Sequence, residues 1–455
     1  MSSISSKKVA VHSLGCKVNS YETEVMVQKL KDAGCILVPF EEEADIYVVN
    51  TCSVTNIADR KSRQMLHRAR KQNPEALIAA VGCYVQGREP EEVLSDGVDL
   101  VIGNEGKADI VTLLEECLEK GYHGTLCDIS KVTGCEEMEL LTTDEHTRAY
   151  IKIEDGCNQF CSYCIIPYVR GRVRSRRPEE IIKEVRALAE KGYCEIVLTG
   201  INMSAYGTDL GDTDLLDLVE RLADIEGISR IRISSLEPRI VTPEFSNRLA
   251  GIKKVCPHFH LSLQSGCDRT LKRMNRHYDS GEYAGVAERL RRDFFRERGA
   301  YPALTTDVIV GFPGETEEDF KECVRFVDGI GFFETHIFKY SPRKGTVAAK
   351  LGDKLTEKEK TARSRVLLDL GEKNRDAYTK QLTKNREYLP ELLVEEHIFM
   401  DGKDLQVGHT GEYIKAAVIS REDLVGRIVK GHLTPTGYRD GGREICMMED
   451  FEIVK

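Results

Sequence analysis

The stretch Cys157-Asn-Gln-Phe-Cys161-Ser-Tyr-Cys164 follows the apolar, strand-like run Ala149-Tyr-Ile-Lys-Ile153 and places three cysteines within eight residues. This C-x3-C-x2-C spacing offers three thiolates from one short loop, one fewer than the four that complete a structural zinc site or saturate an iron–sulfur cluster. A zinc site needs a fourth ligand nearby, and the nearest candidates are His146 and Cys194. Three cysteines so close together also argue against ordinary core thiols. The loop therefore predicts an iron–sulfur cluster with one iron left open to a substrate or cofactor.

The region that this loop opens alternates strand and helix signals as far as residue 340. A helix is predicted from Pro178 to Lys191, with proline at its start and two glutamates in its first turn. Six β/α units in series predict a full or partial parallel barrel, whose active-site groups come from the carboxyl ends of the strands. The predicted strands are residues 149–153, 195–198, 230–233, 258–263, 304–310 and 334–340.

The region before the loop shows the same alternation. Helical periodicity is found over residues 20–33 and again in a helix that ends near Lys71. Together with the strands this is the βαβ pattern of an open, mostly parallel sheet. Its predicted strands are residues 8–12, 45–49, 76–81 and 98–102.

Three further cysteines follow three of these strands. Cys16, Cys52 and Cys83 each come directly after a predicted strand, beside small or polar turn residues. Because the carboxyl ends of parallel strands meet at one edge of a sheet, where doubly wound folds bind ligands, these cysteines are expected to converge. The alternative is three buried small residues, a common location for cysteine. Because all three cysteines follow a predicted strand, a second tri-cysteine metal site is favoured. Cys35 does not follow a strand in this way and is predicted to lie in the core.

The last part of the chain changes character. Thr356-Glu-Lys-Glu359 has the form of a capping box and opens a charged helix that runs to about Leu382. Residues 392–455 alternate in hydrophobicity, carry scattered glycines and include an Asp401-Gly402 turn, which together predict a small antiparallel β-barrel. With an acidic, turn-rich linker at residues 127–148, the predicted domains are residues 1–126, 149–384 (barrel plus connecting helix) and 385–455.

The composition limits the compartment and the partners. The start Met1–Ser6 is polar, unlike a signal peptide, and no apolar stretch is long enough to span a bilayer. Fifteen cysteines without a secretion signal favour a reducing compartment, where clustered cysteines bind metal or do redox chemistry. We therefore expect a cytoplasmic protein with no membrane partner. The net charge of −10 argues against wholesale nucleic-acid binding but leaves room for a local basic face.

Three basic clusters are candidates for such a face. The cluster directly after the cysteine loop is predicted to contact RNA phosphates, because it lies beside a candidate catalytic loop. The other two are weaker candidates, since a basic run is most often a solvated surface. The first cluster is Arg170, Arg172, Arg174, Arg176 and Arg177; the second is Arg60, Lys61, Arg63, Arg68, Arg70 and Lys71; the third is Arg269, Lys272, Arg273 and Arg276.

A tri-cysteine α/β domain, a barrel with a C-x3-C-x2-C loop and a small β-barrel, in that order, resemble the radical-AdoMet methylthiotransferase family over essentially the whole chain. The resemblance implies a flavodoxin-like first domain, a partial (β/α)6 barrel and a TRAM-like, RNA-binding last domain. It implies two [4Fe-4S] clusters, and the cluster in the barrel would bind and cleave S-adenosyl-L-methionine (AdoMet). The implied ligands are Cys16, Cys52 and Cys83 for the auxiliary cluster and Cys157, Cys161 and Cys164 for the catalytic one.

The dipeptide Lys17-Val18 indicates the branch of the family. It resembles the branch that methylthiolates carbon 2 of N6-threonylcarbamoyladenosine at position 37 of tRNA. The branch acting on N6-isopentenyladenosine typically has Gln-Met at these positions, and the branch acting on a ribosomal-protein aspartate has Pro-Lys. These sister activities stay as alternatives. An iron–sulfur RNA-binding regulator, which would bind RNA without turning over AdoMet, is the non-enzyme alternative.

The resemblance also implies the AdoMet contacts, the chemistry and the partners. One AdoMet would methylate sulfur held at or near the auxiliary cluster. A second would yield a 5′-deoxyadenosyl radical that abstracts hydrogen from carbon 2, since an aromatic C–H has no useful acidity. The implied partners are the anticodon stem-loop of tRNA, an electron donor such as flavodoxin or ferredoxin, and a sulfur source. The candidate AdoMet contacts lie at the ends of predicted strands, where ordinary turns and structural polar residues are also found. They are Gly200, Asn202, Ser235, Glu237, Gln264 and Asp307.

One feature of the last domain departs from the resemblance. Residues 386–455 contain nine lysines and arginines against fourteen aspartates and glutamates, so the local charge is negative. RNA binding there would depend on a local face of cations rather than on bulk charge.

Overall fold

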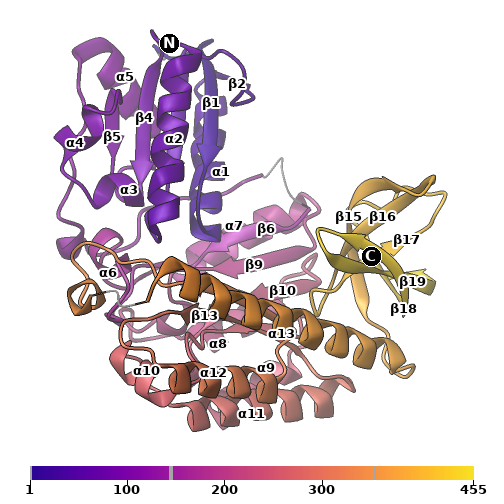
Figure 1. Ribbon diagram of the computed structural model, residues 1–455. Helices are drawn as coiled ribbons and strands as arrows, with labels where there is room; N and C mark the ends of the chain where they lie inside the picture. The colour runs from indigo at the N-terminus through magenta and orange to yellow at the C-terminus, as the bar shows by residue number, and fades with distance from the viewer. Residues whose placement is uncertain (1–2, 143–146, 353–354) are drawn as a thin grey trace.

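The computed structural model describes residues 3–142, 147–352 and 355–455, and builds three strand systems in succession (Figure 1). The first and second are parallel α/β sheets, as predicted, and the third is a separate small barrel at the C-terminal end. In the part of the chain that the structure describes, no helix is long and apolar enough to cross a membrane.

The N-terminal sheet has five parallel strands in the order β2-β1-β3-β4-β5, the 2-1-3-4-5 order of flavodoxin-like folds. Helices α1 and α5 pack on one face and α2 and α4 on the other. The predicted strands are confirmed, while the short elements β2, α3 and α4 and the longer helix α5 are additions to the prediction. The bounds are β1 (Lys8–Ser13), α1 (Lys17–Asp32), β2 (Ile36–Val38), β3 (Ile46–Thr51), α2 (Asn56–Gln72), β4 (Leu77–Gly82), α3 (Cys83–Gln86), α4 (Pro90–Leu94), β5 (Leu100–Ile102) and α5 (Ile110–Lys120).

The central unit contains the six predicted β/α units. Its strands pair in parallel in two runs, β6-β9-β10 and β11-β12-β13-β14, and only Ser234 separates β10 from β11. In the described ranges β6 and β14 do not pair with each other, so the array stays open. The strands are β6 (Ala149–Lys152), β9 (Glu195–Thr199), β10 (Arg230–Ile233), β11 (Ser235–Leu236), β12 (His258–Leu261), β13 (Ala303–Val310) and β14 (Glu334–Lys339); the helices are α7 (Pro178–Glu190), α8 (Leu215–Ala223), α9 (Pro243–Gly251), α10 (Asp268–Arg273), α11 (Ser280–Arg298) and α12 (Glu317–Ile330).

Alternation along these strands separates an apolar from a polar side. Phe259 and Leu261 on β12 belong to the core that the helices cover. His258 and His260, the intervening residues, face the other way and contact polar side chains. The concave interior of the central unit is therefore polar, as a site for a charged ligand requires.

The segment predicted as a linker is packed against the N-terminal unit. Met138 and Leu140 are buried beside Tyr21 and Val25 of α1. The Tyr21 hydroxyl donates to the Met138 carbonyl at 2.7 Å. Acidic neighbours concealed these two core residues in the sequence. Residues 143–146 of the predicted linker lie outside the described residues.

The C-terminal part begins with the predicted helix, α13 (Glu357–Lys384), whose capping box between Thr356 and Glu359 is confirmed. Five strands follow and close into a barrel in the order β15-β16-β17-β19-β18. One prediction is wrong: the barrel is not wholly antiparallel, because β17 and β19 pair in parallel. The predicted Asp401-Gly402 turn joins the first two strands, with both residues at positive φ. The strands are β15 (Glu391–Met400), β16 (Lys403–Thr410), β17 (Lys415–Val418), β18 (Ile428–Asp440) and β19 (Arg443–Ile453).

Candidate metal centres at the junction of the two α/β units

The C-x3-C-x2-C loop follows β6 and the short strand β7 (Glu154–Asp155), and leads into α6 (Ile166–Val169). Gly156 starts the loop at φ +81°, where an added Cβ would lie 1.8 Å from the Arg172 carbonyl oxygen, so only glycine fits. The backbone N–H of Ser162 donates to the Met274 carbonyl at 2.9 Å, and its hydroxyl donates to the Arg273 carbonyl at 2.8 Å. Loop 273–276 thus holds the cysteine loop in place.

The three thiols of this loop sit in a largely dehydrated environment. Burial raises the pKa of Cys157 to about 11 and that of Cys164 to about 12, and the neighbouring Cys161 raises both further. Arg276 Nη1 lies 3.1 Å from Cys161 Sγ and places a positive charge beside it. Without a metal Cys157 and Cys164 keep their protons, so metal binding must release them.

The second set of cysteines lies where the sequence placed it. Cys16, Cys52 and Cys83 follow β1, β3 and β4, and their charges act on one another. An added Cβ on Gly15 would lie 2.9 Å from Cys52 Sγ, so the glycine lets Cys52 approach the first turn. Burial is the main cause that raises the pKa of Cys52 to about 11, with smaller contributions from Cys83 and Cys16. The convergence predicted from strand order is confirmed.

Neither set offers a ready site for one metal ion. Within the described ranges, only His260, Asp307 and His336 bring three ligand atoms within 4.8 Å of one another. Three thiolates bound to one zinc ion at about 2.3 Å would hold their sulfur atoms within this 4.8 Å limit of one another. All fifteen cysteines are free of disulfides. The wider spacing of the thiols suits a multi-iron cluster better than a single zinc ion.

A buried arginine stands beside each set. Arg170 Nε lies 3.4 Å from Cys83 Sγ, as Arg276 lies beside Cys161, and Asn104 Nδ2 lies 3.4 Å from Cys83 Sγ on another side. A guanidinium at this distance offsets the negative charge of a thiolate-bound cluster.

Arg170 also belongs to an ion network that joins the two α/β units. Its Nη1 lies 2.8 Å from Glu22 Oε1 on α1 and 2.9 Å from Asp155 Oδ2 on β7. Lys152 Nζ contacts the same two carboxylates, each at 2.7 Å, and Lys107 completes the network with Glu22. Although burial pushes the pKa of Glu22 upward, Arg170, Lys107 and Lys152 hold it well below its ordinary value. Three cations against two anions leave one positive charge beside Cys83.

The RNA prediction for the first arginine cluster is wrong for three of its five members. Arg170, Arg174 and Arg176 are 0%, 2% and 4% exposed, so they cannot form a phosphate-binding surface. Arg174 pairs with Glu105 at 3.1 Å, and Arg176 pairs with Glu184 at 2.7 Å. Only the two remaining members reach the surface.

These two members differ in their contacts. Arg172 lies over the ring of Phe160 at 4.5 Å, and Arg177 is paired with Asp212 at 3.3 Å across an exposed gap. A run of arginines in sequence does not reveal which side chains have carboxylate partners far along the chain.

Several predicted AdoMet contacts lie around the cysteine loop. Asn202 Nδ2 is 3.7 Å from Cys157 Sγ, and Glu237 accepts from Arg276, which in turn contacts Cys161. The backbone at Gly200 is approached closely, but by the carboxylate of Glu154: an added Cβ would lie 2.6 Å from its Oε1.

Sequence reasoning missed Glu154. Burial raises the pKa of this carboxyl group to about 8, so it is protonated at neutral pH beneath the turn at Gly200 and Asn202. Its place directly after a strand was the available signal, the same signal that identified the other strand-end residues.

The remaining predicted contacts lie further along the array. Gln264 has a positive φ of 68°, and its N–H donates to the Asp307 carbonyl at 2.8 Å. Asp307 Oδ2 lies 3.4 Å from His260 Nε2, and Asp307 stands opposite His336 in the strand register. Ser235 is exposed, and no contact links it to the cysteine loop in the part of the chain that the structure describes.

The polar interior also carries cations next to Cys16. Lys17 keeps exposed surface and forms no hydrogen bond or ion pair with any described residue. Burial by the surrounding protein lowers the pKa of Lys17 to about 8, and the charges of Arg232 and Arg148 lower it further, while Glu195 opposes them. Lys17 therefore lies in an electropositive space that stays open to solvent.

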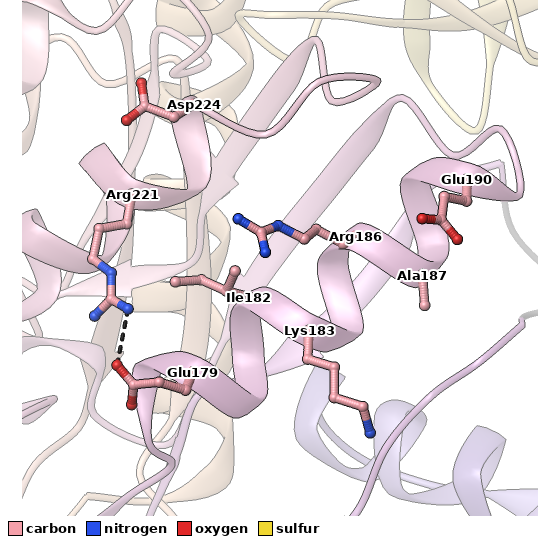
Figure 2. Close-up of a pocket in the computed structure, with 8 residues that line it drawn as sticks. All are labelled: Glu179, Ile182, Lys183, Arg186, Ala187, Glu190, Arg221 and Asp224. Atoms are coloured by element: carbon pink, nitrogen blue, oxygen red, sulfur yellow. Dashed lines mark hydrogen bonds and ion pairs between the residues drawn. The ribbon is translucent and has the colours of Figure 1, made fainter.

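The C-terminal barrel closes one side of this space. Tyr413, at φ +73°, stacks on His258 with ring centroids 5.1 Å apart and lies over the guanidinium of Arg232 at 4.7 Å. Arg232 Nη1 donates to the Gly411 carbonyl at 2.9 Å. A separate hollow between α7 and α8 lies on the outer helical layer and contains no cysteine (Figure 2).

Comparisons with known proteins agree with this arrangement. The profile of the Radical SAM superfamily matches residues 151–327, and that of "Uncharacterized protein family UPF0004" matches residues 8–103. A solved structure of the radical S-adenosylmethionine methyltransferase TsrM from Kitasatospora setae aligns with a TM-score of 0.52, 16% identity and 74% coverage of each chain. At that identity the likeness concerns the fold alone.

Curated relatives are more similar. The threonylcarbamoyladenosine tRNA methylthiotransferase MtaB of Bacillus subtilis (strain 168) is 40% identical over 448 residues, which are 97% of this chain and 97% of the relative. The tRNA-2-methylthio-N(6)-dimethylallyladenosine synthase of Carboxydothermus hydrogenoformans is 33% identical, covering 92% of this chain and 95% of the relative. Such identity along nearly the full length, with a Radical SAM match over the cysteine loop, shows that the chain belongs to the radical SAM methylthiotransferase family.

Proposed function

We propose that this enzyme methylthiolates carbon 2 of N6-threonylcarbamoyladenosine at position 37 of tRNA, next to the anticodon. The observation that carries the proposal is the 40% identity over 97% of both chains to the relative whose name states threonylcarbamoyladenosine. Relatives whose names state dimethylallyladenosine are 33% identical over 92% of this chain and 38% identical over 81% of it.

The electropositive space beside Cys16 supports this substrate. The threonylcarbamoyl group ends in a carboxylate, whereas an isopentenyl group is a hydrocarbon. Arg232 and Arg148 act on Lys17 as like charges, and a carboxylate ligand would compensate this local excess of positive charge. Arg148 lies within electrostatic reach of Lys17. Its Nη1 is buried without a hydrogen-bond partner, although the guanidinium has ion-pair contacts with Glu195 at 3.8 Å and Glu395 at 3.4 Å. We assign Lys17 to the carboxylate of the substrate.

Two [4Fe-4S] clusters and AdoMet are the proposed cofactors, and the residues present fit them. Six free thiols stand in two sets of three, each set has a buried arginine on one sulfur, and neither set is compact enough for a single ion. When bound, these groups supply the one-electron cleavage of AdoMet and the sulfur and methyl group that are transferred. The proposed ligands are Cys157, Cys161 and Cys164 for the AdoMet-cleaving cluster and Cys16, Cys52 and Cys83 for the auxiliary cluster.

The chain's own residues hold and orient these groups. Arg276 would neutralise charge at Cys161 and fix Glu237, and Asn202 would orient Cys157. Protonated Glu154 holds the turn at Asn202 from below. The proposed AdoMet contacts are Gly200, Asn202, Ser235, Glu237, Gln264 and Asp307.

The finer domain assignments follow from the proposed function. We assign residues 1–126 to a flavodoxin-like domain, 127–148 to its connection, 149–384 to a partial (β/α)6 barrel with a connecting helix, and 385–455 to a TRAM-like RNA-binding domain. The closed five-stranded barrel and its place at the C-terminal end support the last assignment. The proposed partners are tRNA, an electron donor such as flavodoxin or ferredoxin, and a sulfur source, in the cytoplasm.

Two alternatives predict different products. A sister enzyme would methylthiolate isopentenyladenosine or a ribosomal-protein aspartate, and a regulator would leave AdoMet uncleaved. Nucleoside mass spectrometry of tRNA from a strain that lacks the gene separates them. We expect loss of the 2-methylthio form of threonylcarbamoyladenosine alone, with the unmethylthiolated nucleoside accumulating. Loss of the isopentenyl product instead, or no change, would contradict the proposal.

Complementation of that strain tests the auxiliary site. The wild-type gene should restore the product, and Cys16→Ala should not, although the purified variant still cleaves AdoMet to 5′-deoxyadenosine. Normal product from Cys16→Ala would refute the assignment of Cys16.

A further inference from the structure

Helix α2 carries the second basic cluster, and its cations lie on the solvent side of the helix, except Arg70, which is partly buried and pairs with Asp99 at 2.6 Å. Asp59, Ser62, Leu66 and Ala69 are the buried positions, which pack toward the N-terminal sheet. The opposite face is exposed. It consists of Arg60, Lys61, Arg63, Gln64, His67, Arg68 and Lys71.

The spacing aligns these cations into a stripe. Arg60, Arg63 and Lys71, with His67 in line between them though not counted as a cation, follow one another at intervals of three or four residues, so they stack on successive turns of one face. At a rise of 1.5 Å per residue the stripe is about 16 Å long. Lys61 and Arg68, seven residues apart, flank it on one side.

The charges of this stripe are not neutralised within the chain. Arg60, Lys61, Arg63 and Lys71 form no hydrogen bond or ion pair with any residue that the structure describes. Arg68 has one long, exposed contact to Glu41 at 3.5 Å, which contributes little. In the first cluster, by contrast, three of the five arginines form ion pairs with carboxylates inside the protein. A chain of net charge −10 has therefore kept a line of free cations on one helix.

The stripe begins next to the candidate metal centres. The helix starts four residues after Cys52, and the Asn56 N–H donates to Ser341 Oγ of the central unit at 3.1 Å. Arg343 crosses the same boundary to Asn56 at 2.7 Å, and the adjacent Lys344 is exposed. From this junction α2 runs along the N-terminal sheet and away from the central unit (Figure 1).

We infer that the exposed face of α2 binds the phosphate backbone of the tRNA substrate, with the stem lying along the helix while the loop reaches the metal centres. The inference rests on the proposed function. Its support is charge complementarity: a line of unpaired cations with no acidic residue among them matches a polyanion whose charges recur along one direction. The main phosphate contact is therefore proposed for residues 60–71 rather than for residues 170–177, where the sequence predicted it.

The test is the salt dependence of tRNA binding by the holoenzyme with both clusters reconstituted. In the test variant Arg60, Lys61, Arg63 and Lys71 are all changed to Gln, exposed substitutions that should leave folding unchanged. Each lost phosphate contact lowers the slope of log K against log salt by about 0.7–0.9, so a total reduction of about 3 is expected. The matched control changes Lys358, Lys373, Lys380 and Lys384 of α13, all exposed, to Gln and should leave the slope near that of wild type.

The outcomes separate this inference from the proposed function. A test variant with wild-type slope and affinity overturns the α2 interface alone. A wild-type holoenzyme without tRNA affinity overturns the proposed function and the interface together. If the test variant binds tRNA like wild type but its clusters are no longer reduced by an acidic flavodoxin, α2 binds a protein partner and the RNA contact is overturned. In turnover, the expected test variant has a raised KM for tRNA and a kcat close to that of wild type.

Discussion

The arginine run at residues 170–177 and helix α2 carry five and six cations, and the fold uses them in opposite ways. In the run, Arg170, Arg174 and Arg176 are buried against Glu22, Glu105 and Glu184 and join the two α/β units. On α2, all the cations except Arg70 face solvent, and four of the six have no partner among the described residues. The difference teaches that a basic cluster acts as a structural tie or as a binding surface according to where carboxylates lie in the fold. Four predictions test this difference, from the largest expected effect to the smallest.

The largest effect is expected for Arg170→Met. The substitution leaves Glu22 and Asp155 short of a buried cation, which should cost about 3–5 kcal/mol of unfolding free energy. Urea unfolding of the anaerobic protein measures it. Arg63→Met on α2 is the control and should change stability by less than about 0.5 kcal/mol. Equal stabilities of the two variants would break the comparison.

The next effect concerns Arg276, the arginine that contacts the cysteine loop at Cys161. Arg276→Gln removes a positive charge beside Cys161, so the bound cluster should become harder to reduce and AdoMet cleavage slower. A redox titration followed by electron paramagnetic resonance measures the potential, and Arg276→Lys should recover part of the shift. An unchanged potential in Arg276→Gln would mean that this arginine only supports the loop.

Much of this architecture was predictable from local sequence signals. The predicted positions of Cys16, Cys52 and Cys83 are confirmed because each follows its strand within three residues, and parallel strands align their carboxyl ends. The six β/α units were likewise read from periodicity within short windows. The capping box at Thr356 and the turn at Asp401 are signals of four residues or fewer.

The rest depends on pairs far apart in the chain. Arg170 and Glu22 are 148 residues apart, and no window of sequence contains both. The same holds for Arg276 beside Cys161 and for the parallel pairing of β17 with β19, which follows from barrel closure. Lys17 was noticed as part of a dipeptide, but its neighbours Arg148 and Arg232 come from other elements.

A smaller effect is expected from pH. Burial, and then the charge of Arg232, depress the pKa of His258 well below 6.5, so the folded protein binds fewer protons there than the unfolded chain. This contribution to stability is full above about pH 6.5 and is lost as the pH falls toward the depressed pKa. His258→Phe keeps a ring on Tyr413 but cannot titrate.

The urea midpoint at pH 7.5, 6.5 and 5.5 checks this prediction. Wild type should lose up to about 1.4 kcal/mol per pH unit more than the variant below pH 6.5. Parallel pH profiles for the two proteins would show that His258 is not held neutral by its surroundings.

The smallest effect is expected for Arg172→Gln combined with Arg177→Gln, the two exposed members of the run. Neither has a buried carboxylate partner, so stability should change by less than about 0.5 kcal/mol. If they touch RNA, the salt slope of tRNA binding falls by less than about 2. A larger loss of stability than in Arg170→Met would reverse the comparison.

The account rests on the identity of the acceptor, and a competition assay tests it most directly. The reconstituted enzyme receives AdoMet, a reductant and equal amounts of two tRNAs, one with N6-threonylcarbamoyladenosine and one with N6-isopentenyladenosine. Mass spectrometry should find the methylthio group on the threonylcarbamoyl nucleoside alone. Lys17→Gln should lower that rate roughly 10- to 100-fold, as expected for the loss of one charged contact of about 1.5–3 kcal/mol. Methylthiolation of the isopentenyl nucleoside, or an unaffected Lys17→Gln enzyme, would contradict the account.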